Sequence, residues 1–146
     1  MYQSDYDMIT IKTNEITVDQ YLAIRASVNW RELSVTQAHK ALQHSLIVAG
    51  AYEGDQLVGM GRIVGDGSVI CYVQDLIVRP EFQRKQVGSK VLNTLIQYVE
   101  SIREEDTQMM LCLMCAKGRE PFYEKHGFVA RPTEALGPGM IQYLRN

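Results

Sequence analysis

The spacing of the apolar residues changes in the middle of the chain, and this change limits the folds open to it. Residues 69–78 form a run of β-branched, aromatic and other apolar side chains, which is typical of a strand. From residue 87, apolar side chains recur instead at steps of three or four, which predicts an amphipathic helix of about four turns. The members of this repeat are Val87, Val91, Leu95, Tyr98 and Ile102. A strand followed closely by a helix that packs on it predicts a mixed α/β fold.

The flanking sequence supplies the other elements of such a fold. Two capping boxes, Thr17 with Gln20 and Ser34 with Gln37, predict the starts of two helices. Glycine-containing turns at 54–55 and 65–67 separate three strand-like segments, which predicts an antiparallel meander. The remaining predicted elements are strands over 8–12, 46–52, 57–64, 109–114 and 141–144 and a short helix over 119–125. No linker or repeat interrupts the chain, so residues 1–146 are predicted to form a single domain.

Composition argues against several classes of partner. The chain has 146 residues, a net charge of −2 and a pI of about 5.9, so no overall field attracts nucleic acid. Its apolar runs are too short to span a bilayer, and the acidic N-terminus does not read as a secretory signal. Three cysteines are an odd number, which suits a reducing compartment. We therefore expect a cytoplasmic protein without nucleic-acid or membrane partners.

The junction between the central strand and the long helix has the features of an anion site. Pro80 ends the strand shortly after Val78, and a short loop with Arg84 and Lys85 leads into the helix. The first turn of a helix presents unpaired amides and a partial positive charge, and Gly88 lets a ligand approach the backbone. Phosphate groups bind at such helix starts, and the two cations add charge of the right sign. The residues alone thus predict a phosphate-bearing ligand.

The same segment resembles the signature of the GNAT superfamily of N-acetyltransferases. Residues 83–88, Gln-Arg-Lys-Gln-Val-Gly, follow a Val-x-Pro strand end as that signature does, but Gln86 replaces its first glycine and leaves less clearance for a pyrophosphate unless the backbone there is helical. The resemblance implies acetyl-coenzyme A as cosubstrate and a splayed, mostly antiparallel sheet of six or seven strands with about four helices. It also implies cosubstrate-binding positions at Leu76, Ile77, Val78, Gln83, Arg84, Lys85, Gln86, Val87, Gly88 and Ser89.

A second motif, Phe-Tyr-Glu-Lys-His-Gly-Phe at 122–128, is similar to the segment that closes these domains. The resemblance implies that Tyr123 protonates the departing thiolate, and a phenol with a pKa near 10 holds its proton at neutral pH. Residues 72–78 are also similar to a strand of glucosamine-6-phosphate N-acetyltransferases, although Gln74 stands where those enzymes have a glutamate. A substrate therefore cannot be carried over from them.

The strand next to the expected acetyl group contains the residues expected to surround the acceptor amine. Tyr72 and Gln74 share a face by the strand period of two and are expected to line the acceptor pocket, whereas Asp75 points to the other face. Asp75 is the only carboxylate of this strand, and a β-bulge could turn it toward the acceptor. Its role as general base and a purely structural role are both open. Trp30 either staples the second helix or borders this pocket.

These features predict an enzyme that moves the acetyl group of acetyl-coenzyme A to a primary amine of a small molecule. The amine would attack directly and form a tetrahedral intermediate, stabilised by a main-chain amide of the strand. Acetylation of a protein amine and a non-catalytic coenzyme A-binding sensor are the alternatives, and a homodimer is possible. Cys112 and Cys115 form a CxxC without a second pair, so core cysteines are preferred to a metal site and no metal is expected.

Overall fold

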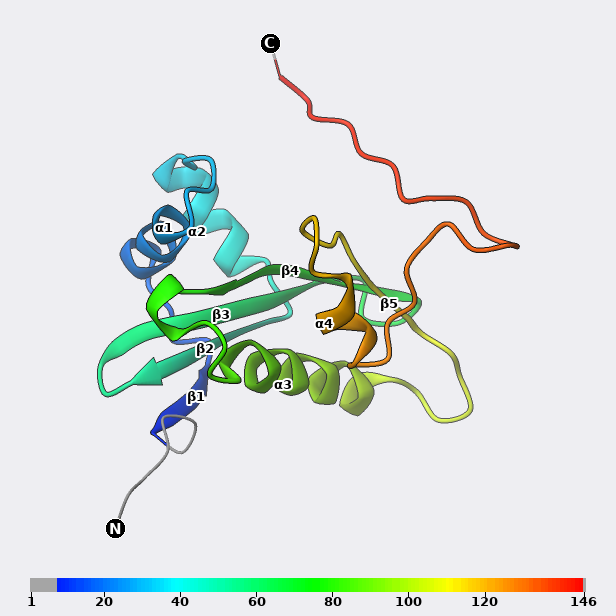
Figure 1. The fold of residues 1–146 in the computed structure, drawn as a ribbon, viewed down its shortest axis with the longest axis horizontal. Coiled ribbons are helices and arrows are strands. Elements are labelled where there is room, and N and C mark those ends of the chain that lie inside the picture. The colour runs from blue at the N-terminus through cyan, green and yellow to red at the C-terminus, as the bar shows by residue number, and fades with distance from the viewer. Residues whose placement is uncertain (1–7, 146) are drawn as a thin grey trace. The chain divides into compact units, whose positions relative to one another are not determined.

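Five strands form one sheet in the order β1-β2-β3-β4-β5 within residues 8–145, the part of the chain that the computed structural model describes (Figure 1). The chain divides into two compact units, of which the first extends to Cys112 and the second begins at Leu113. Each unit is described by itself. The elements are β1 Ile9–Thr13, α1 Val18–Ser27, α2 Val35–Gln43, β2 Ile47–Glu53, β3 Gln56–Gly65, β4 Ile70–Val78, the 3-10 helix η1 Pro80–Phe82, α3 Val87–Ile102, β5 Met110–Leu113 and α4 Glu120–Glu124.

The first four strands pair antiparallel in chain order, which confirms the predicted meander. β5 joins the sheet beside the start of β4, where the Met110 N–H donates to the Val69 carbonyl at 3.0 Å. The Cys112 thiol lies 3.7 Å from the Cys71 carbonyl. Since both contacts advance in the same direction along the two segments, β5 runs parallel to β4, and the sheet is mixed.

Helices α1 and α2 begin where their local sequence predicts. The Thr17 and Ser34 side chains each accept a hydrogen bond from the backbone N–H three residues later, and the Gln20 and Gln37 side-chain oxygens accept one from the backbone N–H of the cap residue. Two free N–H groups are thereby satisfied at each helix start, for a gain of about 1 kcal/mol per cap. Neither of these helices, nor any other in the described part of the chain, is long and apolar enough to cross a membrane.

The helices of the first unit cover both faces of its sheet (Figure 1). Helices α1 and α2 pack on one face, over a core that includes Tyr21, Ile24, Leu57, Met60 and Ile77. Helix α3 packs on the other face. There a Cβ at Gly59 would lie 2.7 Å from Val87, and a Cβ at Gly61 would lie 2.8 Å from Leu95. These two glycines therefore allow α3 to lie close to β3.

The mixed α/β class is confirmed, but the sheet has five strands in the described residues and not the six or seven expected. The predicted strand at 141–144 is absent, and residues 129–145 contain no helix or strand. Ile141 and Leu144 are instead exposed. An apolar extended segment becomes a strand only when a neighbouring strand completes its hydrogen bonds, and no strand ladder forms in this stretch.

The second unit contains α4 and the aromatic residues of the 122–128 motif. Helix α4 ends near Gly127, whose φ of +89° is the left-handed conformation expected of a glycine after a helix. The Tyr123 ring packs edge-on against Phe122 at 5.1 Å and Phe128 at 5.9 Å between centroids. Residues 122–128 therefore form a local cluster that fixes the Tyr123 ring within its unit.

Candidate functional site

The second half of β4 extends beyond its neighbour β5. β4 has nine residues and β5 has four, and the two strands start level with each other. Because the strands are parallel, β5 ends beside the first part of β4, and residues 74–78 extend past it. An extended segment can pair with backbone groups of this kind. Residues Leu76, Ile77 and Val78, predicted to bind a cosubstrate through their backbone, lie on this part of β4.

The loop that follows β4 is held by hydrogen bonds to β3 and to the end of β4 itself. The Arg79 Nε donates to the Leu57 carbonyl at 2.7 Å, and the Arg79 N–H donates to the Val58 carbonyl at 2.9 Å. The Gln83 side-chain amide donates to the Val78 carbonyl at 3.0 Å. Gln83, predicted to bind the cosubstrate, is therefore used in this structure to fasten the loop that bears Arg84 and Lys85.

Helix α3 starts at this loop with an N-terminus that its cap residue leaves open. Gln86 is the N-cap and forms no side-chain hydrogen bond to the helix, so its side chain satisfies none of the first amides. Its backbone is left-handed, with φ 65° and ψ 12°, so the right-handed helical backbone that would accommodate a non-glycine residue is not present. Arg84 is left-handed as well, with φ 66°. The amides of Val87, Gly88 and Ser89 thus begin the helix beside two cationic side chains.

A β-bulge interrupts β4 at the residues predicted to line the pocket for the acceptor amine. Arg62 lies opposite Gln74 and Met60 opposite Ile77, so two residues of β4 face the single Gly61 of β3. Asp75 is in the bulge with φ 56°, a left-handed conformation that aspartate tolerates better than most residues. The period of two alone would point Asp75 away from Gln74, but the bulge, which the sequence left open, breaks this period and brings the two side chains together. The bulge turns Asp75 toward the face that α1 covers.

The Asp75 carboxylate is fully enclosed and accepts hydrogen bonds at both oxygens. Oδ1 accepts from Arg25 Nη1 at 2.9 Å and from the Gln74 amide at 3.3 Å. Oδ2 accepts from Arg62 Nε at 2.8 Å and from the Tyr21 hydroxyl. The carboxylate side chain is 0% exposed, and each arginine side chain is 12% exposed. We call Tyr21, Arg25, Arg62 and Asp75 the Asp75 cluster.

The cluster changes the acidity of its tyrosine. The pKa of Tyr21 is raised to about 12, first by burial and then by the charge and hydrogen bond of Asp75, while the charges of Arg62 and Arg25 lower it in part. The hydroxyl therefore stays protonated and donates to Asp75 throughout the neutral range. Three of the cluster's four members were not among the residues predicted from the sequence. A signal existed for one of them, since Arg62 is a lone charge within the apolar strand β3.

The other residues predicted to line the acceptor pocket are only partly enclosed. Tyr72 of β4 pairs with Val64 of β3 and is half-buried, and Gln74 is half-buried as well. Trp30 is 39% exposed, and its ring faces the Arg25 guanidinium at 5.4 Å. Tyr123 is half-buried in the second unit. Of the predicted catalytic residues, the structure brings Gln74 and Asp75 into direct contact.

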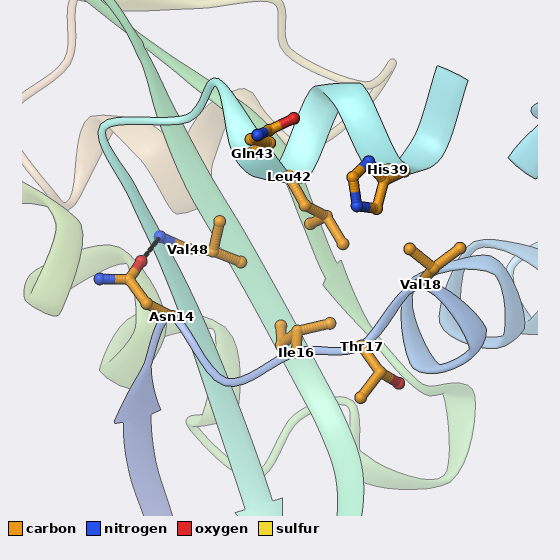
Figure 2. A pocket seen from close by; sticks show the side chains of 8 residues that line it. All are labelled: Asn14, Ile16, Thr17, Val18, His39, Leu42, Gln43 and Val48. Atoms are coloured by element: carbon orange, nitrogen blue, oxygen red, sulfur yellow. Dashed lines mark hydrogen bonds between the residues drawn. The ribbon is translucent and has the colours of Figure 1, made fainter. Parts of the chain in front are cut away.

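A groove of about 370 Å³ lies elsewhere on the first unit, between α2 and the segment that joins β1 to α1 (Figure 2). Asn14 fastens this region, because its side chain accepts a hydrogen bond from the Val48 N–H at 2.9 Å. None of the predicted site residues lines the groove. Its walls are formed by Asn14, Ile16, Thr17, Val18, His39, Leu42, Gln43 and Val48. Apart from His39 it holds no titratable side chain, so it does not account for group-transfer chemistry.

The cysteines differ in burial, and the expectation that the CxxC pair is part of the core is wrong for one of them. Cys71 is buried and Cys112 is half-buried, whereas Cys115 is exposed because it follows the end of β5. Burial raises the thiol pKa of Cys115 even so, and nearby Glu120 raises it too. Among the described residues, no three His, Cys, Asp or Glu side chains gather as metal ligands.

The arrangement of a mixed sheet, a bulged central strand and an open helix start was compared with known proteins. A model of the acetyltransferase (GNAT) domain matches residues 43–130, which include β2 to α4. The chain belongs to the GNAT acetyltransferase family. The predicted recognition motifs at 83–88 and 122–128 both lie in the matched region, and the family assignment made from them is confirmed.

Similar proteins cover nearly the whole chain. A GNAT family acetyltransferase of Streptococcus pneumoniae is 32% identical, with a TM-score of 0.77 over 95% of this chain and 100% of that chain. A probable acetyltransferase of Staphylococcus aureus is 28% identical, with a TM-score of 0.81 over 93% and 100%. The protein named GCN5-related N-acetyltransferase 1, chloroplastic, of Arabidopsis thaliana is 29% identical over 92% of this chain and 67% of its own length. The cytoplasmic location expected from the sequence stays a prediction.

Proposed function

We propose that this GNAT protein transfers the acetyl group of acetyl-coenzyme A to a primary amine of a small molecule. The observation that supports this most is the open start of α3. Its cap side chain forms no hydrogen bond to the first amides, Arg84 and Lys85 precede it, and the protruding end of β4 leads to it. A pyrophosphate and an extended pantetheine chain need this combination of an anion site and a strand edge.

The residues present fit acetyl-coenzyme A, which supplies the acetyl group as a thioester. The amides of Val87, Gly88 and Ser89 would hold the pyrophosphate, and Arg84 and Lys85 would neutralise part of its charge. The backbone of residues 76–78 would pair with the pantetheine chain. Gln86 is the least favourable part of this fit, because its side chain stands where the signature has a glycine.

The bulge in β4 would give the acetyl carbonyl a place to bind. A bulge leaves a backbone group outside the strand ladder, and the Leu76 amide follows Asp75 at that point. This amide would donate to the carbonyl oxygen as negative charge develops on it. The four donors around Asp75 would hold the bulge in place. Asp75 is thus assigned a positioning role in place of the general-base role.

The reaction would then proceed by direct attack. The amine, as a free base, forms the N–C bond with the acetyl carbon, and the C–S bond breaks. A water molecule held by Tyr72 and Gln74 would accept the proton that the amine loses, and the Tyr123 hydroxyl would give a proton to the leaving thiolate. The proton taken up by the water replaces, through solvent, the one that Tyr123 gives up, so the free amine and acetyl-coenzyme A become the acetylated amine and the free thiol with no net release of a proton.

Calorimetric titration with acetyl-coenzyme A, followed by thiol-release assays over small amines and peptide amines, tests this proposal. Binding with thiol release for small amines is expected. Gly88→Glu should weaken binding strongly, because a carboxylate would face the pyrophosphate. Binding without release from any amine would support the non-catalytic sensor, and release with peptides alone would support a protein acceptor. An absence of binding would overturn the assignment.

The assignment of Tyr123 as general acid has its own test. Tyr123→Phe removes the hydroxyl but retains the ring that packs with Phe122 and Phe128. General-acid catalysis contributes about 10²- to 10⁴-fold, so turnover should fall in that range while the affinity for acetyl-coenzyme A is unchanged. Tyr143→Phe, at an exposed tyrosine of the same unit, is the control. Unchanged turnover in Tyr123→Phe would remove the tyrosine from the mechanism.

A further inference from the structure

The Asp75 cluster contains more positive than negative charge. Arg25 and Arg62 both bind the single Asp75 carboxylate, at 2.9 and 2.8 Å, and no other ion pair involves either arginine among the described residues. Their other recorded hydrogen bonds go to neutral oxygens, the Arg31 carbonyl for Arg25 and the Ser45 hydroxyl for Arg62. Two guanidinium groups thus share one carboxylate, and one positive charge is left without a counterion.

This excess charge is largely removed from water, and its hydrogen-bonding capacity is incompletely used. Each arginine side chain is only 12% exposed. The Arg25 Nε is buried without a hydrogen-bond partner. A guanidinium has five N–H donors, so after the bonds described above both arginines retain donors. Burying a charge is unfavourable unless it is paired, so an anion that reached these donors would be stabilised.

The cluster lies beside the place where the acceptor must bind. Its member Asp75 lies on β4 and contacts Gln74. The next residue in the chain is Leu76, whose amide is proposed to donate to the acetyl carbonyl. Successive residues of a strand are about 3.3 Å apart, so the arginines lie within the length of a small molecule from the acetyl group. Trp30, stacked against Arg25 and 39% exposed, adds a flat apolar surface next to the charge.

We propose that the acceptor amine bears a carboxylate or phosphate group that binds Arg25 and Arg62. This inference rests on the proposed acetyltransferase function and specifies its substrate class. Guanidinium groups bind such oxyanions through paired N–H bonds, and Asp75 holds both groups in fixed orientations before the substrate arrives. Polyamines and other polycations are disfavoured, because the net charge of the Asp75 cluster has the same sign as theirs.

Matched pairs of acceptors test the substrate class. The amino acids glycine, β-alanine and γ-aminobutyrate are compared with their amides, and glucosamine 6-phosphate with glucosamine, in thiol-release assays. The acidic member of at least one pair is expected to have a kcat/KM about tenfold or more above its neutral twin, as for a hydrogen bond to a charged group. The amino-acid pairs report a carboxylate site and the amino-sugar pair a phosphate site. Equal rates within every pair, or a preference for spermidine, would overturn the inference.

Variants show whether the two arginines cause the preference. Arg25→Gln and Arg62→Gln each leave one arginine against Asp75, so the cluster becomes charge-balanced. In each variant the ratio of kcat/KM between acidic and neutral twins should fall toward one. This ratio does not depend on how much of the protein is folded, because both substrates meet the same molecules. Arg103→Gln, at a half-buried arginine just after the last residue of α3, should leave the ratio unchanged. An unchanged ratio in both cluster variants would remove the arginines from recognition.

A binding measurement separates this inference from the proposed function. The N-acetylated amino acids and their N-acetylated amides are titrated calorimetrically into protein saturated with coenzyme A. Tighter binding of the acids, lost in Arg25→Gln, supports the anion site even if no acceptor releases thiol, in which case only the acetyl-transfer proposal fails. Thiol release with equal binding of acids and amides would leave acetyl transfer standing and overturn the anion site.

Discussion

Asp75 is a buried carboxylate whose stability depends on its neighbours. Removing one partner of a buried ion pair typically costs about 3–5 kcal/mol, because the other charge remains buried without compensation. Asp75→Asn keeps the shape of the side chain but leaves Arg25 and Arg62 without any counterion. We therefore expect it to lower the free energy of unfolding by about 3 kcal/mol, measured by urea denaturation. Glu100→Gln, which breaks an exposed pair with Arg103, should change the free energy little.

The same variant distinguishes the two roles that the sequence leaves open for Asp75. A positioning residue would affect turnover through the bulge, so the pH profile of the remaining activity should keep its shape. Loss of a general base would instead remove the acidic limb of that profile. An Asp75→Asn protein as stable as the wild type would contradict the description of the cluster given above.

Tyr21 makes part of the stability dependent on alkaline pH. Its pKa is about 12 in the folded protein and 10.0 as the reference value, so the folded state retains this proton over a range in which the unfolded state loses it. Stability therefore falls as the pH rises from about 10 to 12, by at most about 3 kcal/mol from this group. Below pH 10 the contribution is fully present. Tyr21→Phe should lack this loss, so unfolding free energies of the two proteins measured from pH 8 to pH 11 should converge. Parallel curves would contradict the prediction.

Among the structural elements, the loop before α3 contains a residue in an unfavourable conformation. A left-handed backbone costs an L-residue roughly 1–2 kcal/mol compared with the right-handed form, and Gln86 has φ 65°. Gln86→Gly should relieve this strain and clear the space above the first amides of α3. We expect acetyl-coenzyme A to bind several-fold more tightly, with no loss of thermal stability. Gln86→Ala shortens the side chain but keeps the strain, so comparing the two variants by calorimetry separates the effects. Weaker binding by Gln86→Gly would show that the Gln86 side chain takes part in binding.

The elements differ in how far the sequence could predict them, because some depend on local and others on distant residues. Helices α1 and α2 are bounded by capping boxes whose partners are three residues apart, and both were predicted. The bulge at Asp75 could be named from the sequence only as a possibility, because it arises from the pairing of β4 with β3. Three of the four donors to Asp75 are 54, 50 and 13 residues away in the chain, at Tyr21, Arg25 and Arg62. Sequence periodicity contains no information on contacts between such distant residues. The strand predicted at 141–144 is missing for the same reason, because its apolar pattern is local whereas the partner strand that it needs would have to come from elsewhere in the chain.

For the molecule as a whole, net charge and local charge predict opposite effects on acetyl-coenzyme A. The protein carries −2 overall, so its total field does not attract an anionic ligand, whereas Arg84 and Lys85 at the start of α3 do. Arg84→Gln with Lys85→Gln should weaken binding at low salt by about tenfold or more, and should flatten the decline in affinity as salt increases, because Debye screening acts over about 10 Å at 0.1 M. Lys40→Gln with Arg103→Gln changes the net charge equally, from −2 to −4, at an exposed lysine of α2 and a half-buried arginine just after α3. This second pair should change the affinity by less than about twofold. Calorimetric titrations across a salt series compare the two double variants. Equal losses in both would mean that the total field governs binding, and the phosphate site at the start of α3 would have to be placed elsewhere.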